Sequence, residues 1–344
     1  MARRLKDYFP LIRSREEVLE AINANELLNT TYQSWEEEAR QEFLDFCSGA
    51  RGVKMTFDGF FKEIMSPEYH RERLESLLSI LLGEEVKINQ VLPNDSVRIA
   101  DEVTLLITDI VVELSDESLV NIEIQKFGLA FPGERASCYI ADLLLRQYKR
   151  VKSIRKKKFS YKDIKKVYSI ILLEKSTKEF AQMPGEYLHD GKFIFNTGLK
   201  LNILQEIMFI ALDIFKKTQQ NKPIETKLEA WLTFISTEEP EQIAELIQKF
   251  PEYKVMYEEV YEICRNIEEV MGMFSKELRE LDKNTIRYMV EELQDEVDQL
   301  RKEKQEALEK ERKEKQEILE KSEKKDKRIK ELEDRLRSLE NGAG

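Results

Sequence analysis

Two short β-rich stretches, TLLITDIVVEL at 104–114 and SLVNIEIQ at 118–125, decide the fold of this chain. Both consist largely of Val, Ile and Leu, which are enriched in strands. The polar residues Ser-Asp-Glu-Ser at 115–118 connect them and are typical of a turn. The pattern therefore predicts an antiparallel β-hairpin.

The hairpin carries polar residues in places where apolar ones are expected. Side chains of a strand alternate with period two, so Glu123 and Gln125 share one face while Ile124 and Lys126 share the other. On the neighbouring strand Asp109 interrupts an apolar run, where a charge is costly unless it is paired or binds a cation. Two acids on adjacent strands indicate a metal site with oxygen ligands.

The chemistry of such a site follows from the ligand preferences of Mg²⁺, for which Mn²⁺ is a possible substitute. Mg²⁺ takes a few carboxylates together with waters and substrate phosphate. We expect Asp109 and Glu123 to supply carboxylates and the backbone carbonyl of Ile124 to be a third ligand. Gln125 could orient a water or a phosphate oxygen. From these residues alone, the alternative is that the acids are structural and either form salt bridges or lie at a strand edge.

The order of elements around the hairpin is mixed. Ser14 with Glu17, and Ser34 with Glu37, read as capping boxes that open two short helices. Residues 201–215 are apolar enough for a strand or another buried segment, and periodicity leaves both open. Other expected elements are helices at 57–65 and 69–83, a strand at 86–92, a helix at 134–152, a strand at 168–174, and helices from Pro223 onward.

Composition restricts the class of protein. The chain has 344 residues and a formal net charge of −11, although the stretch KRVKSIRKKKFSYKDIKK at 149–166 is strongly basic. Three cysteines without a C-x-x-C pair suit a reducing compartment. No signal-peptide core and no long uncharged apolar run occurs, so we expect a cytoplasmic protein without membrane insertion. Only two histidines and no P-loop argue against a zinc finger and a nucleotide cofactor.

The segment after the hairpin supplies candidate phosphate contacts. Arg135 and Tyr139 are one helical turn apart, and the planar fork of Arg135 suits a phosphate. Basic residues follow, with Phe159 and Tyr161 interleaved among the later ones; they predict a salt-sensitive DNA contact, or equally a solvated basic loop. The basic residues in question are Lys149, Arg150, Lys152, Arg155, Lys156, Lys157 and Lys158.

The C-terminal region has a heptad pattern. Apolar residues recur at alternating steps of four and three from Met256 to Phe274, and again through Leu293, Val297 and Leu300. We expect self-association from about Tyr257 to Leu300, as a homo-oligomer. Farther on, a coiled coil and a solvated single helix with Glu–Lys pairs both remain open.

The helix FDGFFKEIM (57–65), the hairpin and the helix ERASCYIADLLLRQY (134–148) together resemble the PD-(D/E)XK nuclease superfamily. More closely, about residues 1–215 are similar to the Rpn family of recombination-promoting nucleases and transposase-like proteins. The resemblance implies an α/β fold with a mixed sheet flanked by helices, followed by an all-α, partly coiled-coil tail.

The same resemblance assigns roles. It places the catalytic motif on Asp109, Glu123 and Gln125, with the two acids 123 − 109 = 14 residues apart, and an acid of the first helix, Asp58, often joins such a site. The superfamily more commonly has Lys where this chain has Gln125, and Lys126 is one residue out of register.

These observations lead to one functional hypothesis and two alternatives. The implied reaction is Mg²⁺-dependent hydrolysis of DNA phosphodiesters by an endonuclease linked to recombination or mobile elements. One alternative is a catalytically inactive, oligomeric DNA-binding or scaffold protein, and the other is a nuclease effector in defence. The expected organisation is a helical segment at 1–50, the nuclease domain at 51–216, a helical region at 217–285 and a charged long helix or coiled coil at 286–344.

Overall fold

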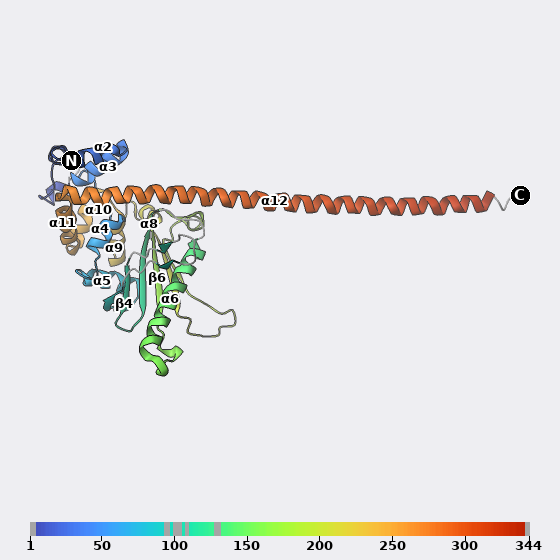
Figure 1. Ribbon diagram of the computed structural model, residues 1–344, viewed down its shortest axis with the longest axis horizontal. Coiled ribbons are helices and arrows are strands. Elements are labelled where there is room, and N and C mark those ends of the chain that lie inside the picture. The colour runs from blue at the N-terminus through green and yellow to red at the C-terminus, as the bar shows by residue number, and fades with distance from the viewer. Residues whose placement is uncertain (1–4, 93–96, 99–104, 107–109, 127–131, 341–344) are drawn as a thin grey trace. The chain divides into compact units, whose positions relative to one another are not determined.

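The computed structural model of the chain describes residues 5–92, 97–98, 105–106, 110–126 and 132–340 (Figure 1). The chain divides into two compact units, Met1–Ile286 and Arg287–Gly344. The segments expected at 1–50, 51–216 and 217–285 all fall in the first unit, where one hydrophobic core contains residues from each of them.

A six-stranded mixed sheet, counted over the described residues, forms the centre of the first unit. Its strand order is β1-β4-β5-β6-β8-β7, in which β5 pairs antiparallel with β4 and parallel with β6. A separate two-stranded sheet consists of β2 and β3. The strands are β1 (Ile88–Val91), β2 (Val97–Arg98), β3 (Leu105–Leu106), β4 (Ile110–Leu114), β5 (Leu119–Gln125), β6 (Val167–Leu173), β7 (Leu188–Gly191) and β8 (Gln205–Ala211).

The predicted hairpin is confirmed as β4 and β5, with Ile110 opposite Ile122. Its turn is closed by the N–H of Leu114, which donates to the carbonyl of Ser118 over 2.8 Å. Glu117 adopts φ 69°, the left-handed conformation that such a tight turn needs. The turn therefore fixes the register of every side chain along β5.

Alternation along β5 separates two layers. Val120 and Ile122 enter the main core, which the N-terminal and C-terminal helices fill. Leu119 faces the opposite way and packs with Ile140 and Leu143 of α6 (Pro132–Arg155). Helix α6 thus covers one face of the sheet, and it lies beside β6 in Figure 1.

The N-terminal helices begin and end partly as predicted. Ser14 caps α1 with the complete capping box to Glu17. The second box is wrong: Ser34 is the last residue of a preceding helix, and its hydroxyl donates to the carbonyl of Thr31 over 2.6 Å. The elements are η1 (Leu5–Asp7), α1 (Arg15–Asn23), α2 (Glu26–Ser34), α3 (Glu37–Cys47), α4 (Asp58–Ile64) and α5 (Arg71–Leu82), which ends at Gly83.

The segment at 201–215, left open by its periodicity, is a strand followed directly by a helix, since β8 ends at Ala211 and α8 begins at Leu212. In the described part of the chain, no helix combines the length and the apolar character that crossing a bilayer requires. The remaining elements are η2 (Lys156–Lys158), η3 (Tyr161–Asp163), α7 (Lys178–Ala181), α8 (Leu212–Gln219), α9 (Lys227–Ser236), α10 (Pro240–Lys249), α11 (Glu252–Arg265) and α12 (Ile267–Glu340).

The first half of the heptad pattern packs in the core of its own chain, whereas self-association was predicted for it. A break at Asn266 separates α11 from α12, and the apolar residues from Met256 to Phe274 are buried or packed in the core of their own chain. A helix that packs on a core and a helix in a coiled coil share the same spacing. The prediction of a self-association seam beginning at Tyr257 is therefore wrong for this stretch.

An aromatic cluster ties α12 to the N-terminal helices. The ring of Phe274, with 1% of its surface exposed, lies 5.0 Å from Trp35, 5.6 Å from Phe43, 5.5 Å from Phe46 and 5.8 Å from Phe57, between centroids. Tilted and edge-on rings at such separations attract each other beyond their burial. Phe274 therefore joins segments that are far apart in the sequence.

We predict that Phe274→Ala lowers the free energy of unfolding by about 3–5 kcal/mol, because it leaves a cavity among four aromatic rings. Urea denaturation followed by circular dichroism measures the change. Phe193→Ala is the control, since this ring is 64% exposed and its loss should cost less than about 0.5 kcal/mol. Equal stability of the two variants would contradict the role given to Phe274.

Candidate functional site

Glu123 and Gln125 form a buried polar pair at the carboxyl end of β5. Each has only 8% of its surface exposed, and the amide Nε2 of Gln125 donates to Oε1 of Glu123 over 3.1 Å. The two residues lie two positions apart on a strand that is paired on both sides, so they share one face. The register deduced from the sequence thus matches the observed one.

The neighbouring strand beside the pair is apolar. In the parallel ladder Glu123 lies opposite Ile171 and Gln125 opposite Leu173, and both β6 residues pack against Ala136 of α6. The first turns of α6 therefore cover the end of the sheet that carries the pair. A carboxylate and an amide in such a place need specific partners to offset their desolvation.

Arg135 and Tyr139 belong to these first turns of α6. They precede Ala136 and Ile140, which are buried against the sheet, and they are themselves half-buried. A guanidinium and a phenol one turn apart therefore belong to the same turns of α6 as Ala136, and their contact with a phosphate stays a prediction.

The second acid of the predicted site, Asp109, lies outside the described residues. The residue after it in the chain, Ile110, is opposite Ile122, the residue before Glu123. Within the described part of the chain, no three His, Cys, Asp or Glu side chains are grouped so as to hold a metal ion. The described donors that fit a hard cation are the Glu123 carboxylate and the carbonyl of Ile124.

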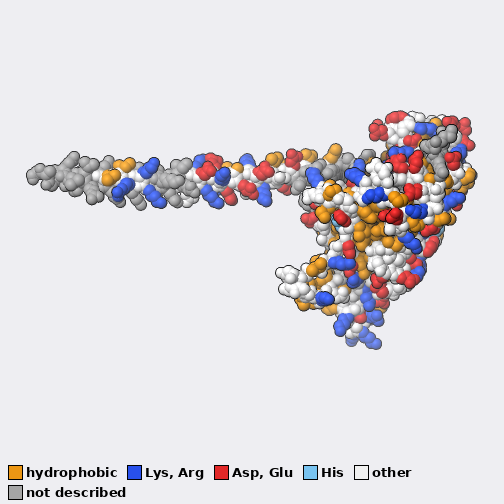
Figure 2. All heavy atoms as spheres, turned by 180° about the vertical axis from the view of Figure 1, so that it is seen from behind, with side chains coloured by type: hydrophobic (Ala, Val, Ile, Leu, Met, Phe, Trp, Pro, Cys, Tyr) orange, Lys and Arg blue, Asp and Glu red, His pale blue; other side chains and the backbone are white. Residues whose placement is uncertain are grey.

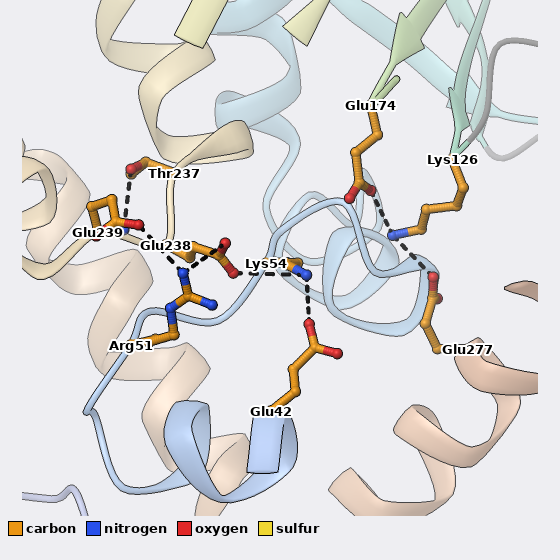
Figure 3. A network of polar contacts seen from close by, with 9 residues as sticks. All are labelled: Glu42, Arg51, Lys54, Lys126, Glu174, Thr237, Glu238, Glu239 and Glu277. Atoms are coloured by element: carbon orange, nitrogen blue, oxygen red, sulfur yellow. Dashed lines mark hydrogen bonds and ion pairs between the residues drawn. The ribbon is translucent and has the colours of Figure 1, made fainter. Parts of the chain in front are cut away.

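Lys126 occupies the opposite face of the sheet, as the alternation predicted. Its Nζ lies 3.0 Å from Oε2 of Glu174 and 2.9 Å from Oε1 of Glu277 (Figure 3). It also lies 4.6 Å from the ring centroid of Phe57. Its side chain is only 11% exposed. Lys126 therefore connects the ends of β5 and β6 to α12, on the side away from Glu123.

The ion pairs of Lys126 change the acidity of a partner. Burial by itself would raise the pKa of Glu174, but the Lys126 ammonium and a hydrogen bond from Thr56 outweigh it and hold the pKa below its ordinary value. Glu174 is therefore ionised at neutral pH. The charge of Lys126 is thus paired within this network, on the face of the sheet away from Glu123.

Asp58 lies with the Lys126 network. Its backbone N–H, at the start of α4, donates to Oε2 of Glu277 over 3.1 Å, and its carboxylate pairs with Lys62 at 2.6 Å and with Lys276 at 3.3 Å. The structure thus brings Asp58 to the face of the sheet opposite Glu123 and Gln125. These contacts give it a role in ion pairing between α4 and α12.

Two residues toward the C-terminal end of α6 hold the helix against the sheet. Gln147 is buried, donates to the carbonyl of Glu117 over 3.0 Å and accepts from the N–H of Lys165 over 3.1 Å. Arg150 forms an ion pair with the buried carboxylate of Glu113 on β4. Arg150 was predicted as a phosphate contact, but this pairing makes it a residue that holds α6 on the sheet.

The remaining basic residues of this stretch face solvent. Within the described part of the chain, Lys149, Arg155, Lys156, Lys157 and Lys158 are exposed and form no ion pair, whereas Lys152 donates to the hydroxyl of Tyr148 over 2.8 Å. Figure 2 shows Lys and Arg side chains gathered at the end of the first unit where α6 ends in Figure 1. The positive surface predicted from the sequence is therefore local to this end.

A pocket of about 450 Å³ lies at another part of the sheet. Gly83 at the end of α5, Tyr168 and Ser169 on β6, and Asp190 on β7 are among its lining residues, and neither Glu123 nor Gln125 lines it. The pocket and the polar pair are therefore separate features of the sheet.

Comparison with known proteins gives one match. Residues 55–292 match the model of a family described as PD-(D/E)XK nuclease family transposase. The matched range contains Asp109, the Glu123–Gln125 pair and the whole of α6. Searches of curated proteins and of solved structures found no match.

We predict that Lys126→Met lowers the free energy of unfolding by about 3–5 kcal/mol at pH 7, because the buried carboxylate of Glu277 and the half-buried carboxylate of Glu174 lose their cation. The pKa of Glu174 is depressed in the folded state, so the stability it contributes is present above its unfolded pKa and is lost as pH falls through the folded pKa. The difference between variant and parent should therefore shrink below about pH 4.

Urea denaturation at pH 7 and at pH 3.5 measures both effects. Lys126→Met combined with Glu174→Gln is the compensating control, and it should recover part of the loss at pH 7. A cost that stays the same at both pH values would contradict the ion-pair interpretation.

Proposed function

The chain belongs to the family described as PD-(D/E)XK nuclease family transposase. On that premise we propose that it is a metal-dependent endonuclease that hydrolyses DNA phosphodiester bonds. The observation that carries the proposal is the Glu123–Gln125 pair, buried on one face of β5 beneath the first turns of α6. The family is one of nucleases linked to mobile elements, and cleavage is the reaction proposed here. Strand joining is not part of the proposal.

The proposed metal ligands are the carboxylates of Asp109 and Glu123 and the carbonyl of Ile124. These are the hard oxygen donors that Mg²⁺ prefers, and Mn²⁺ could replace it. When bound, such an ion lowers the pKa of a coordinated water and offsets negative charge on the phosphate. Glu123 contributes from a strand paired on both sides, which fixes its backbone, and the hydrogen bond from Gln125 restrains its carboxylate.

Gln125 has a positioning role in this proposal. Its amide donates to Glu123 and so orients that carboxylate. The amide is neutral, and it can both donate and accept a hydrogen bond, whereas a lysine would add a positive charge at the same place. Gln125 therefore holds the acid and can direct a water or a phosphate oxygen without supplying electrostatic stabilisation of its own.

The proposed DNA contacts follow α6. Arg135 and Tyr139 act near the polar pair, where the planar guanidinium can donate two hydrogen bonds to one phosphate. Contacts to the DNA backbone from the far end of the helix are assigned to the exposed residues Lys149, Lys152, Arg155, Lys156, Lys157 and Lys158. Arg150 is left out because it pairs with Glu113.

Self-association is proposed through the second unit. On α12 the apolar residues Leu293, Val297 and Leu300 are exposed and follow each other at steps of four and three. That spacing places them on one stripe of the helix, which a second copy of the chain can cover. The proposed homo-oligomer therefore forms through residues C-terminal to the part of the heptad pattern that the core already uses.

An inactive DNA-binding scaffold is the competing interpretation, favoured by one observation: an amide stands at the position where the superfamily commonly has a lysine. Nicking of supercoiled plasmid in the presence of Mg²⁺ separates the two functions. A chain that binds DNA but never nicks it, at any Mg²⁺ or Mn²⁺ concentration, is a scaffold.

We predict that Glu123→Gln and Asp109→Asn each reduce plasmid nicking at least 100-fold while DNA binding persists, because each removes one charged ligand and keeps the side-chain size. Glu117→Gln is the matched control, since this glutamate is exposed in the turn of the same hairpin. It should nick at the parental rate. Nicking by Glu123→Gln at the rate of the control would refute the assigned site.

We further predict that Val297→Asp together with Leu300→Asp converts the oligomer to a monomer, because carboxylates in an apolar seam are costly to bury. Light scattering coupled to size-exclusion chromatography gives the mass. Gln294→Asp, an exposed neighbour outside the stripe, is the control and should keep the oligomeric mass. A monomeric parent chain would remove the seam from the proposal.

A further inference from the structure

Three aromatic rings form a cluster at the far end of α6. The rings of Tyr148 and Tyr161 are stacked, with centroids 6.3 Å apart and an interplanar angle of 15°. Phe159 lies edge-on to both, with centroids 5.5 Å from each. Two of these residues come from the stretch after α6 and one from the helix itself, so the cluster depends on the fold of this end.

The cluster is held in place by local structure. Ser160 caps η3, and its N–H donates to the carboxylate of Asp163 over 2.8 Å in a complete capping box. Lys152 reaches back from α6 over the ring of Tyr148, with its Nζ 5.1 Å from the centroid. The rings are thus positioned before any ligand binds, which reduces the entropy lost on binding.

One ring of the cluster faces solvent. Tyr161 is 75% exposed, although an aromatic side chain of this size is normally at least half covered. Exposed basic residues lie near it in the sequence, at Arg155, Lys156, Lys157, Lys158 and Lys162. An exposed ring among unpaired cations, supported from behind by other rings, is the composition of a platform on which a nucleic-acid base stacks while its phosphates meet the cations.

This combination selects single strands. A base within a duplex has both of its faces covered by neighbouring bases, so an aromatic ring can stack only on a base that is unpaired or at an end. Cations alone would contact any phosphate backbone and give no such preference. The exposed ring therefore distinguishes this end of α6 from a general electrostatic contact.

The position of the cluster relates it to the polar pair. Tyr139 and Arg155 are 16 residues apart on one helix, which corresponds to about 24 Å at 1.5 Å per residue. That length equals about seven nucleotides at the 3.4 Å spacing of a B-form strand, and fewer for an extended strand. One strand that passes along α6 can therefore reach both places.

We propose that Tyr148, Phe159 and Tyr161, with the lysines around them, form a binding platform for single-stranded DNA, so that the substrate carries an unpaired segment several nucleotides from the cleaved bond. The identity of the nucleic acid as DNA rests on the proposed function. The platform itself is independent of Glu123, and binding can be measured without cleavage.

The test uses fluorescence anisotropy with labelled dT20 and with a 20-base-pair duplex, both titrated with the full chain carrying Glu123→Gln. In this background, Tyr161→Ala should weaken dT20 binding about 5- to 100-fold and change duplex binding less than twofold, since one stacked base is lost. Tyr161→Phe is the matched control: it keeps the ring and should bind dT20 like the parent.

The cations are tested by salt dependence. Replacing Lys156, Lys157 and Lys158 together by Gln should reduce the slope of log affinity against log salt for dT20 by about two, at about 0.7 per contact. Replacing the exposed Lys302, Lys310 and Lys313 by Gln removes equal charge from α12 and should leave the slope unchanged.

The outcomes separate the two proposals. If Tyr161→Ala binds dT20 like the parent, or loses dT20 and duplex equally, the platform is overturned. If the parent chain never nicks DNA but shows the expected Tyr161 dependence, the nuclease function fails and the platform stands.

Discussion

Strand β5 is hydrogen-bonded on both sides, antiparallel to β4 and parallel to β6, and this double pairing fixes which way each of its side chains points. A slip by one residue would exchange the two faces completely. Val120 and Ile122 would leave the main core, and the polar pair would enter it in their place. Burial of apolar surface on one face therefore specifies where Glu123 and Gln125 lie on the other.

The same constraint gives neighbouring residues different functions. Glu123 and Gln125 lie beneath α6, whereas Lys126 joins Glu174 and Glu277 on the side of α12. A lysine with two carboxylate partners is costly to remove, because its loss leaves both carboxylates without their cation. The ion-pair network and the proposed site thus share one strand and lie on opposite faces of the sheet.

The fold was largely predictable from local patterns, because short stretches of sequence are enough to show the alternation of a strand and the residues of a turn. The hairpin, the cap at Ser14 and the end of α5 at Gly83 are such features. Features that depend on distant partners were not predictable. Ser34 ends a helix instead of starting one, and the residues from Met256 to Phe274 pack on their own chain, although their spacing equally fits a coiled coil.

In the candidate site, too, local features were predictable and contacts with distant residues were not. The common face of Glu123 and Gln125 follows from alternation alone. The pair of Asp58 with Lys276 and the pair of Arg150 with Glu113 join residues 218 and 37 positions apart, and no local pattern indicates them. Tyr148 was likewise missed as a partner of Phe159 and Tyr161, since its ring meets them only when the chain after α6 turns back.

Helix α6 is the element that connects these parts. Its first turns cover the end of the sheet that carries Glu123, its middle packs on Leu119 and Val167, and Gln147 and Arg150 anchor it at the hairpin turn and on β4. Beyond these anchors, the last residues of the helix, 152–155, are exposed to solvent. The helix is therefore longer than the core requires. Its last turns and the segment after it carry clustered aromatic rings and exposed basic side chains, and such a surface is suited to binding a ligand.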